Sequence, residues 1–190
     1  TTNILNVLST GNVGIGTTTP ATALYVIGTI TATGEIISRN NGLVVKLESP
    51  PMGEIYFTSN GTSTTIASAG VFVKVTGVTT FDSNSMYFGT SNTNNRLVYT
   101  GTSTKVFHVA MTASYTCGNA KVVGLAIAKN GTTTGMEKSR IRDSFLAGNV
   151  QSTAIHVMPV LSQYDYLEVF VTNHTDTTAV TVETLNMFAM

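Results

Sequence analysis

The strongest constraint on the fold is the segment 161–171, Leu-Ser-Gln-Tyr-Asp-Tyr-Leu-Glu-Val-Phe-Val, which alternates in the manner of a β-strand. Successive side chains of a strand point to opposite faces of its sheet. One face here would carry three aliphatic residues: Leu167, Val169 and Val171. The other face would carry Tyr166 and Phe170, where an ordinary half-buried strand has polar residues. The tail 179–190 is similarly apolar, so we predict a sheet that meets other surfaces on both faces.

From residue 69 to 190, short β-like runs alternate with turns, and helical periodicity is nearly absent. Nine strands are predicted: 71–78, 85–88, 96–100, 105–115, 120–129, 133–141, 152–161, 165–172 and 179–188. The dipeptide Asn130-Gly131 supplies both positive-φ positions of a type I′ turn, so the strands on either side of it should pair as a hairpin. The pattern predicts an all-β head over 69–190, built as a sandwich or jelly roll.

The residues from 161 to the C-terminus resemble the end of the tumour-necrosis-factor/C1q-like jelly roll. In that family a Leu-x-x-Gly-Asp pattern precedes the penultimate strand, and the last strand ends in an aromatic-aliphatic run near a threefold axis. Here Leu161 and Asp165 match the pattern, Tyr164 stands where the family has Gly, and Phe188 lies in the final run. The resemblance covers roughly the last two-thirds of the chain, and it implies a trimeric jelly roll rather than any particular chemistry.

Residues 1–68 contain repeats instead. Leu5-Asn-Val7, Leu24-Tyr-Val26 and Leu43-Val-Val45 recur at intervals of 19 residues. Short strands of this kind cannot bury a face alone, so neighbouring units or neighbouring chains must cover them. Chance recurrence in a stretch rich in Thr, Gly and Val stays open as an alternative. The stretch 11–36 resembles the shaft repeats of viral and phage tail fibres, which implies a trimeric β shaft over 1–68.

Composition excludes several functions. Only 11% of the 190 residues are charged and the formal net charge is +0, so no basic surface exists for nucleic acid or for an anionic membrane. No apolar run is long enough to cross a bilayer as a helix, and no membrane insertion is expected. The single Cys117 excludes an intramolecular disulfide.

Catalytic and metal-binding groups are few. The three histidines are spread along the chain, and no Cys/His cluster matches a zinc site. Asp143, Ser144 and His156 can be drawn as an acid–nucleophile–base set, but no nucleophile-elbow glycines flank the serine. The acidic residues show no pairing of the kind that glycoside hydrolysis needs. We therefore predict that the chain is not an enzyme and holds neither metal nor cofactor.

The two-sided apolar strands predict a homotrimer. The run 120–129 adds small apolar residues on its second face, which suit the close approach of another subunit. A monomer rarely leaves a large contiguous apolar patch in water. Five residues are predicted to lie in the trimer interface: Val122, Ala126, Tyr166, Phe170 and Phe188.

Receptor contacts usually come from loops on a rigid scaffold. The loop 89–96 has an Asn- and Ser-rich composition that suits sugars, and the segment 136–143 holds the only basic cluster, which suits an acidic glycan. The predicted receptor-binding residues are Tyr87, Asn92, Asn94, Asn95, Arg96, Lys138, Arg140 and Arg142. Plain solvated loops are the competing interpretation of both segments.

These features favour the distal part of a trimeric viral or phage fibre on the virion surface, outside the cell. Its head would attach the particle to a host surface receptor, expected to be a carbohydrate, by multivalent binding without catalysis. Because Thr1 is not Met, the remainder of a longer fibre or virion protein is expected before it. Two alternatives stay open: a structural spike whose head mainly nucleates trimerisation, and a secreted C1q-like or lectin-like binding module.

Overall fold

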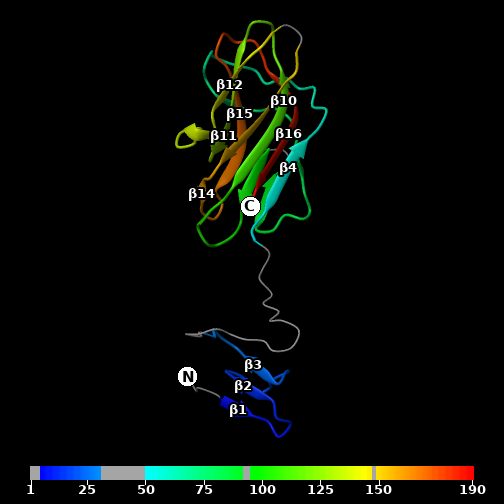
Figure 1. Ribbon diagram of the computed structural model, residues 1–190, viewed down its shortest axis with the longest axis vertical. Helices are drawn as coiled ribbons and strands as arrows, with labels where there is room; N and C mark the ends of the chain where they lie inside the picture. Colours follow the sequence, from blue (N-terminus) through cyan, green and yellow to red (C-terminus); the bar gives the residue numbers. More distant parts are fainter. Residues whose placement is uncertain (1–4, 31–49, 92–94, 147–148) are drawn as a thin grey trace. The chain divides into compact units, whose positions relative to one another are not determined.

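The computed structural model describes residues 5–30, 50–91, 95–146 and 149–190, and the chain divides into two compact units, Thr1–Lys46 and Leu47–Met190. The first unit holds three strands of three residues each: β1 (Leu5–Val7), β2 (Val13–Ile15) and β3 (Leu24–Val26) (Figure 1). β1 pairs antiparallel with β2, and β2 pairs parallel with β3. Two copies of the 19-residue repeat are thus strands, whereas the third, 43–45, lies outside the described residues.

The second unit is a sandwich of two sheets (Figure 1). The first sheet has the order β13 (Gln151–Val157), β10 (Val109–Thr116), β16 (Thr181–Ala189), β4 (Gly53–Phe57) and β6 (Thr80–Phe81). The second has the order β12 (Ile141–Ser144), β11 (Val122–Lys129), β15 (Tyr166–Asn173), β8 (Arg96–Tyr99) and β7 (Phe88–Ser91), with β5 (Val73–Lys74) also paired to β15. β9 (Lys105–Val106) pairs separately with β14 (Val160–Leu161), and η1 (Glu137–Ser139) is a single helical turn. Within the described ranges, no helix has the length and apolarity to span a bilayer.

The strand order identifies the head as a jelly roll. The described strand pairs of this unit are all antiparallel. The chain changes sheet between β10 and β11, between β12 and β13, and between β15 and β16. The facing sets β4-β16-β10-β13 and β8-β15-β11-β12 are the two halves of a double Greek key. The predicted all-β jelly-roll head is therefore confirmed.

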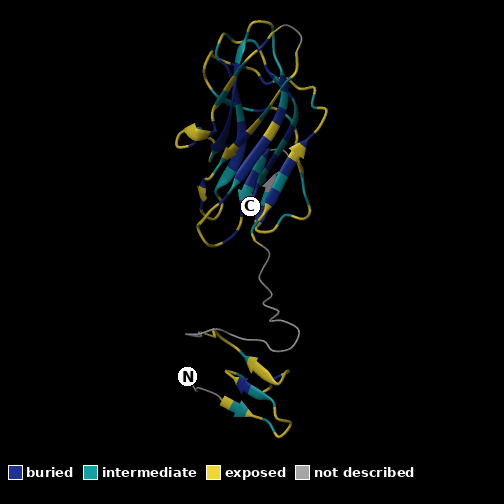
Figure 2. Ribbon diagram, in the orientation of Figure 1, coloured by how far each residue is buried: buried dark blue, intermediate teal, exposed yellow. Residues whose placement is uncertain are grey.

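The core lies between the two sheets, where the buried residues are drawn dark blue in Figure 2. The three inward residues predicted for β15 are all buried: Leu167, Val169 and Val171. Three aromatic rings fill part of the same core, and the centroids of Phe88, Tyr99 and Phe107 lie between 4.9 and 5.3 Å apart. Period-two alternation in the sequence thus matches the burial of the sheets.

The predicted type I′ turn is present after β11. Asn130 and Gly131 have φ of 53° and 78°, both in the left-handed region that this turn requires. The backbone N–H groups of Lys129 and Thr132 donate to each other's carbonyl oxygens at 2.9 and 3.1 Å. The local sequence alone specified this reversal of the chain.

The strand predicted over 133–141 is not formed. After the bridge at Thr132 the chain makes the η1 turn, and β12 pairs with the far end of β11. The buried Ser139 holds the segment beside β11, because its Oγ accepts a hydrogen bond from the Ile127 N–H at 3.0 Å and lies 3.1 Å from the Ile127 carbonyl oxygen. The hydroxyl group of Ser139 thus makes the hydrogen bonds to β11 that the backbone of a paired strand would make.

The head begins earlier than the predicted boundary at residue 68. β4 lies between β16 and β6, with Ile55 and Phe57 in the core. Thr64 also forms a bridge with Val180, just before β16. The boundary therefore moves to a point before β4. The residues of β4 alternate in burial as a strand of the head does.

The start of β4 and the end of β16 lie at one end of the head, which we call the basal end (Figure 1). Gly53, the first residue of β4, is the register partner of Ala189, the last residue of β16. Exposed apolar side chains collect on the segments that meet at this end: Met52, Met86, Val106, Met158, Val160 and Met190.

Candidate functional site

A pocket of about 580 Å³ lies on the outer face of the second sheet, and we call it the outer pocket. Its apolar lining residues are Val71, Phe72, Ile141 and Phe170. Its polar lining residues are Thr132, Thr133, Arg140, Arg142 and His174. They come from the loop before β5, the turn after β11, β12 and the residue before it, the middle of β15 and the residue after it, so the sheet holds the pocket walls in place.

Arg140 is positioned by three contacts. Its Nη2 donates to the carbonyl oxygen and to Oγ1 of Thr133, at 3.2 and 3.1 Å. Its guanidinium carbon lies 5.5 Å from the centre of the Phe72 ring, within cation–π range. Glu137 is 3.9 Å away, which is a weak ion pair between exposed groups. The guanidinium is thus oriented at the pocket while most of its charge stays available.

Arg142 projects from β12, where its register partner is Gly124 of β11. It makes no hydrogen bond or ion pair with another residue in the described ranges. Its charge acts on His174 instead. Burial first, and then the positive charge of Arg142, lower the pKa of His174. The imidazole is therefore neutral near pH 7, and the charge at this wall is that of the arginine.

His174 follows β15 directly and is anchored by its backbone N–H, which donates to the Val122 carbonyl at 2.7 Å. Its ring meets Phe72 edge-on, with centroids 6.1 Å apart. Its Nε2 is buried and has no hydrogen-bond partner among the described residues. A Cβ on Gly124 would come within 2.8 Å of this nitrogen, so the glycine makes room for the imidazole over β11.

These groups suit an anionic ligand. Guanidinium groups bind carboxylate, sulfate and phosphate oxygens in a bidentate manner. The aromatic and aliphatic lining supplies an apolar surface for the body of the same molecule. No trio of His, Cys, Asp or Glu side chains fit to hold a metal occurs in the described ranges. The outer pocket therefore brings two guanidinium groups beside an apolar surface.

The structure separates the two predicted receptor-binding clusters. Arg140 and Arg142 line the outer pocket, whereas Lys138 is exposed in η1 outside its lining. The loop 89–96 belongs to β7 and β8, at the opposite edge of the second sheet from β12. Tyr87 lines a separate pocket of about 130 Å³. Asn92 and Asn94 lie outside the described residues.

Two residues predicted to bind a receptor make contacts within the head. The side chain of Asn95 is buried; its Oδ1 accepts from the Thr79 N–H at 3.0 Å, and its Nδ2 donates to the Val75 carbonyl at 3.4 Å. Arg96 Nε donates to Glu168 Oε1 at 2.9 Å, and its guanidinium carbon lies 4.1 Å from the centre of the Tyr166 ring. The Asn95 amide is thus buried and engaged within the chain, and the Arg96 Nε is paired with Glu168; a receptor-binding role for Arg96 stays a prediction.

The predicted interface residues do not form one surface. Four lie on the second sheet, namely Val122, Ala126, Tyr166 and Phe170, whereas Phe188 lies on the first. Ala126 is 0% exposed in the single chain, so it has no surface left for a partner to cover. Phe170 lines the outer pocket, and Tyr166 lies under Arg96. The structure places Phe188 alone on a different outer face.

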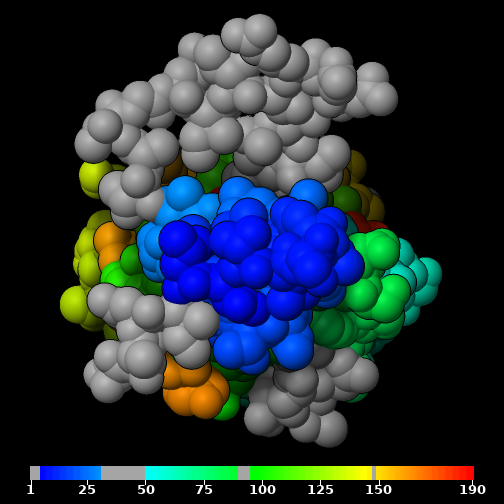
Figure 3. Space-filling view, turned by 90° about the horizontal axis from the view of Figure 1, so that it is seen from below, coloured from blue at the N-terminus to red at the C-terminus, as the bar shows by residue number. Residues whose placement is uncertain are grey.

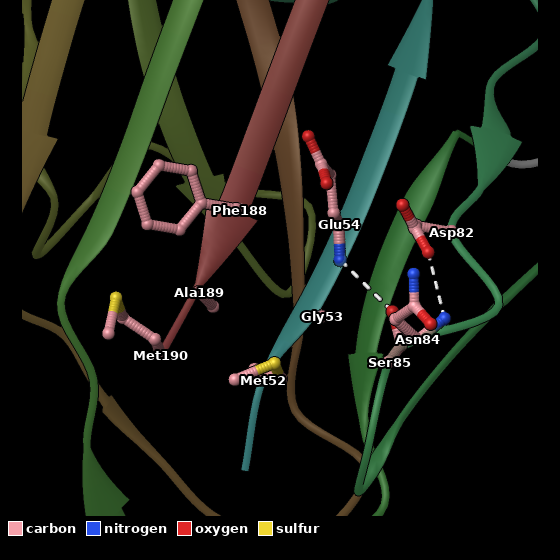
Figure 4. Close-up of a pocket in the computed structure, with 9 residues that line it drawn as sticks. All are labelled: Met52, Gly53, Glu54, Asp82, Asn84, Ser85, Phe188, Ala189 and Met190. Carbon is pink, nitrogen blue, oxygen red and sulfur yellow. Dashed lines mark hydrogen bonds between the residues drawn. The ribbon is translucent and has the colours of Figure 1, made fainter. Parts of the chain in front are cut away.

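That outer face, on the first sheet, is built mostly of small neutral residues from β13, β10 and β16. Beside Phe188 it holds a pocket of about 250 Å³. Figure 4 shows Phe188 and Met190 on one side of it and the polar side chains of Glu54, Asp82, Asn84 and Ser85 on the other. Glu54 accepts a hydrogen bond from Asn186, so its carboxylate is already partnered.

The same face holds a pair that was missed from the sequence. His108 Nε2 lies 3.0 Å from His156 Nδ1, although the two residues are 48 positions apart. The register of β10 and β13 brings them together, because Ala110 is the partner of His156. The only signal in the sequence was the alternation of each predicted strand, which sets the face on which each histidine lies but not which strands pair.

No protein-family model matches the chain, and no curated protein matches it in sequence. Solved structures that it is similar to include murine APRIL at pH 5.0, at 10% identity over 73% of this chain and 98% of that chain, with a TM-score of 0.46. The globular domain of the zebrafish complement 1qA protein gives 7% identity over 74% and 96%, with a TM-score of 0.43. The PRD1 vertex protein P5 gives 11% identity over 73% and 71%, with a TM-score of 0.46. These likenesses are distant, and the jelly-roll assignment rests on the strand order of the two sheets.

Proposed function

We propose that this chain is the distal part of a homotrimeric viral or phage fibre, whose jelly-roll head attaches the particle to a host surface receptor without catalysis. The observation that carries the proposal is the exposed apolar surface of the N-terminal unit. Leu5 and Leu24 are 70% and 58% exposed in the single chain. Further apolar residues of this unit are also exposed: Val7, Ile15, Tyr25, Ile27 and Ile30. Figure 3 shows the surface of this unit in blue.

Such a unit has too little buried surface to be stable by itself. Three strands of three residues form a minimal sheet, and a sheet needs a hydrophobic face covered by a partner for independent stability. Leu5 and Leu24 occupy equivalent places in the 19-residue repeat, so the other two chains of a trimer can cover both in the same way along the threefold axis. The exposed apolar side chains at the basal end of the head support the same conclusion, because water-exposed patches of this kind mark association surfaces.

The outer pocket supports the proposed attachment. Arg142 and Arg140 offer charge to an acidic group, while Phe72 and Phe170 offer an apolar surface. In a trimer this pocket is present three times. Three weak contacts made together raise the effective concentration at each remaining site, so attachment becomes strong without any tight single site. The proposed occupant is an acidic glycan of the host surface.

The oligomer is tested by light scattering on the full chain. We expect a mass of three chains, and we expect Leu5→Asn combined with Leu24→Asn to lower it. Thr10→Asn, at an exposed polar position of the same unit, is the matched control and should leave the mass unchanged. A single-chain mass for the unmodified protein at all concentrations would contradict the proposal.

Receptor binding is tested on an array of neutral, carboxylated and sulfated glycans. We expect the acidic glycans to bind and Arg142→Gln to weaken them, while Lys138→Gln, outside the pocket, has little effect. A trimer that binds no glycan and no host cell would favour the alternative, a structural spike whose head only nucleates trimerisation.

A further inference from the structure

Two imidazole rings face each other on the outer surface of the first sheet. His108 Nε2 and His156 Nδ1 are 3.0 Å apart, and the ring planes are within 14° of parallel. We propose that this pair is a chelating site for a first-row transition-metal dication of the Zn²⁺ or Cu²⁺ kind. The ion would replace the hydrogen bond between the two nitrogens, and the proton of the donor ring would move to the other nitrogen of that ring.

The fold holds both rings at this spacing. His156 lies in β13, opposite Ala110 of β10. His108 directly precedes β10, and its backbone exchanges two hydrogen bonds with that of Met190. The His108 N–H donates to the Met190 carbonyl oxygen, and the Met190 N–H donates to the His108 carbonyl oxygen, with nitrogen–oxygen distances of 2.8 and 3.0 Å. The two histidines are therefore diagonal neighbours on one face of an antiparallel pair, close enough for long side chains to meet. Phe188 packs edge-on against the His108 ring at 6.1 Å between centroids and limits its rotation.

The distance fits a shared metal ion. Imidazole nitrogens lie about 2.0–2.1 Å from Zn²⁺, and two of them at a tetrahedral angle are about 3.3 Å apart. At the observed 3.0 Å, both rings would turn so that the two nitrogens aim at a common point beside the line that joins them. Neither of the two nitrogens has another hydrogen-bond partner in the described ranges, so the metal displaces no contact except the one between the rings.

The pair supplies two ligands, and water completes the coordination. No third His, Cys, Asp or Glu stands close enough in the described ranges to add a protein ligand. Imidazole suits Zn²⁺, Cu²⁺ and Ni²⁺, and affinity for a nitrogen site follows the order Zn²⁺ below Cu²⁺. Both ligands come from one chain, so the site needs no trimer, and its test stands apart from that of the proposed function.

The test is isothermal titration of the full chain with Zn²⁺ and, separately, with Cu²⁺, in a non-chelating buffer at a pH of about 7.5. We expect one ion per chain and tighter binding of Cu²⁺. His108→Gln and His156→Gln should each weaken binding on the order of 100-fold, because the second ligand binds intramolecularly. His174→Gln is the matched control, since it removes the remaining histidine, on the other sheet, and should leave binding unchanged.

A second measurement guards against variants that fold poorly. The melting temperature without metal should be similar for the unmodified chain, His108→Gln and His156→Gln, because both rings of the pair are at least partly exposed. Added Zn²⁺ should raise it for the unmodified chain and for His174→Gln, but not for the two pair variants. Electron paramagnetic resonance of the Cu²⁺ form should show two nitrogen ligands. Binding that survives His108→Gln, binding lost in His174→Gln, one ion for three chains, or no binding at millimolar metal would each overturn the proposal.

Discussion

Glu168 places a carboxylate inside the protein between two cations, and its neighbours lead to a sharp prediction. Its side chain is 2% exposed, and Oε1 lies 3.0 Å from Lys74 Nζ and 2.9 Å from Arg96 Nε. Both cations are about one-third exposed, so either can turn to water if it loses the carboxylate. The carboxylate has no such freedom. The folded state therefore stays stable only while at least one cation pairs with this buried carboxylate.

We therefore expect the two cations to substitute for each other. Lys74→Ala should lower the free energy of unfolding by about 1 kcal/mol, because Lys74 is partly solvated and Arg96 still pairs with the carboxylate. Arg96→Ala should cost about 2 kcal/mol, because the packing of its guanidinium on Tyr166 is lost as well. The double variant should cost about 4–5 kcal/mol, more than the sum, because the buried carboxylate is then left without a counter-charge.

The measurement is a double-mutant cycle by urea unfolding at neutral pH and fixed chain concentration. A third substitution gives the control: Glu168→Gln added to the double variant removes the unpaired charge and should restore part of the lost stability. If the two single effects add to within about 0.5 kcal/mol, the cations do not share the carboxylate and the reasoning is refuted. A triple variant no more stable than the double would refute it independently.

Further predictions concern the turn, the outer pocket and the loop after β15. Gly131→Ala should destabilise the protein by about 1 kcal/mol in urea unfolding, because the residue has a φ of 78°; an unchanged midpoint would contradict this. Arg142→Gln should raise the pKa of His174, measured by NMR titration, because it removes the repelling charge but not the burial; a pKa that stays the same would exclude that arginine as a cause. The hydrogen bond from Lys121 and those within the loop lower the pKa of Asp176 to about 2. Its contribution to stability should be complete above a pH of about 4, the unfolded value, and should be lost as the pH falls toward 2. Asp176→Asn should remove that acid dependence from pH-unfolding curves.

Features set by neighbours in the sequence were predictable. The faces of β15 followed from alternation, so Leu167 and Val171 were placed in the core correctly. The reversal at Asn130-Gly131 followed from the φ values that these two residues tolerate. The basic cluster that includes Arg140 and Arg142 was predictable because its members are close in the sequence, on β12 and in the segment just before it.

Features set by distant pairings were not predictable. The pocket walls Phe72 and His174 reach the arginines only through the pairing of β5 and β12 with a common sheet, which no local pattern specifies. From the sequence, the outer face of β15 was predicted to meet another surface because Tyr166 and Phe170 lie on it, with Glu168 between them. In the structure its partners come from β5 and β8, and they cover that face from within the chain. Asn95 was misjudged for the same reason, since its hydrogen-bond partners lie some 16 to 20 residues away.

The meeting of Gly53 and Ala189 at the basal end determines how the head responds to mechanical tension. If the head is held at the outer pocket, as the proposed function requires, and the chain is pulled from before Pro50, the force runs along β4. Hydrogen bonds of an antiparallel pair lie perpendicular to the strands, so the five residue pairs between β4 and β16 are sheared together instead of being unzipped in sequence. β6 flanks β4 on its other side and adds a second ladder to the same resistance. Under such a force, β4 separates from the head only when all of its hydrogen bonds to β16 and β6 break together.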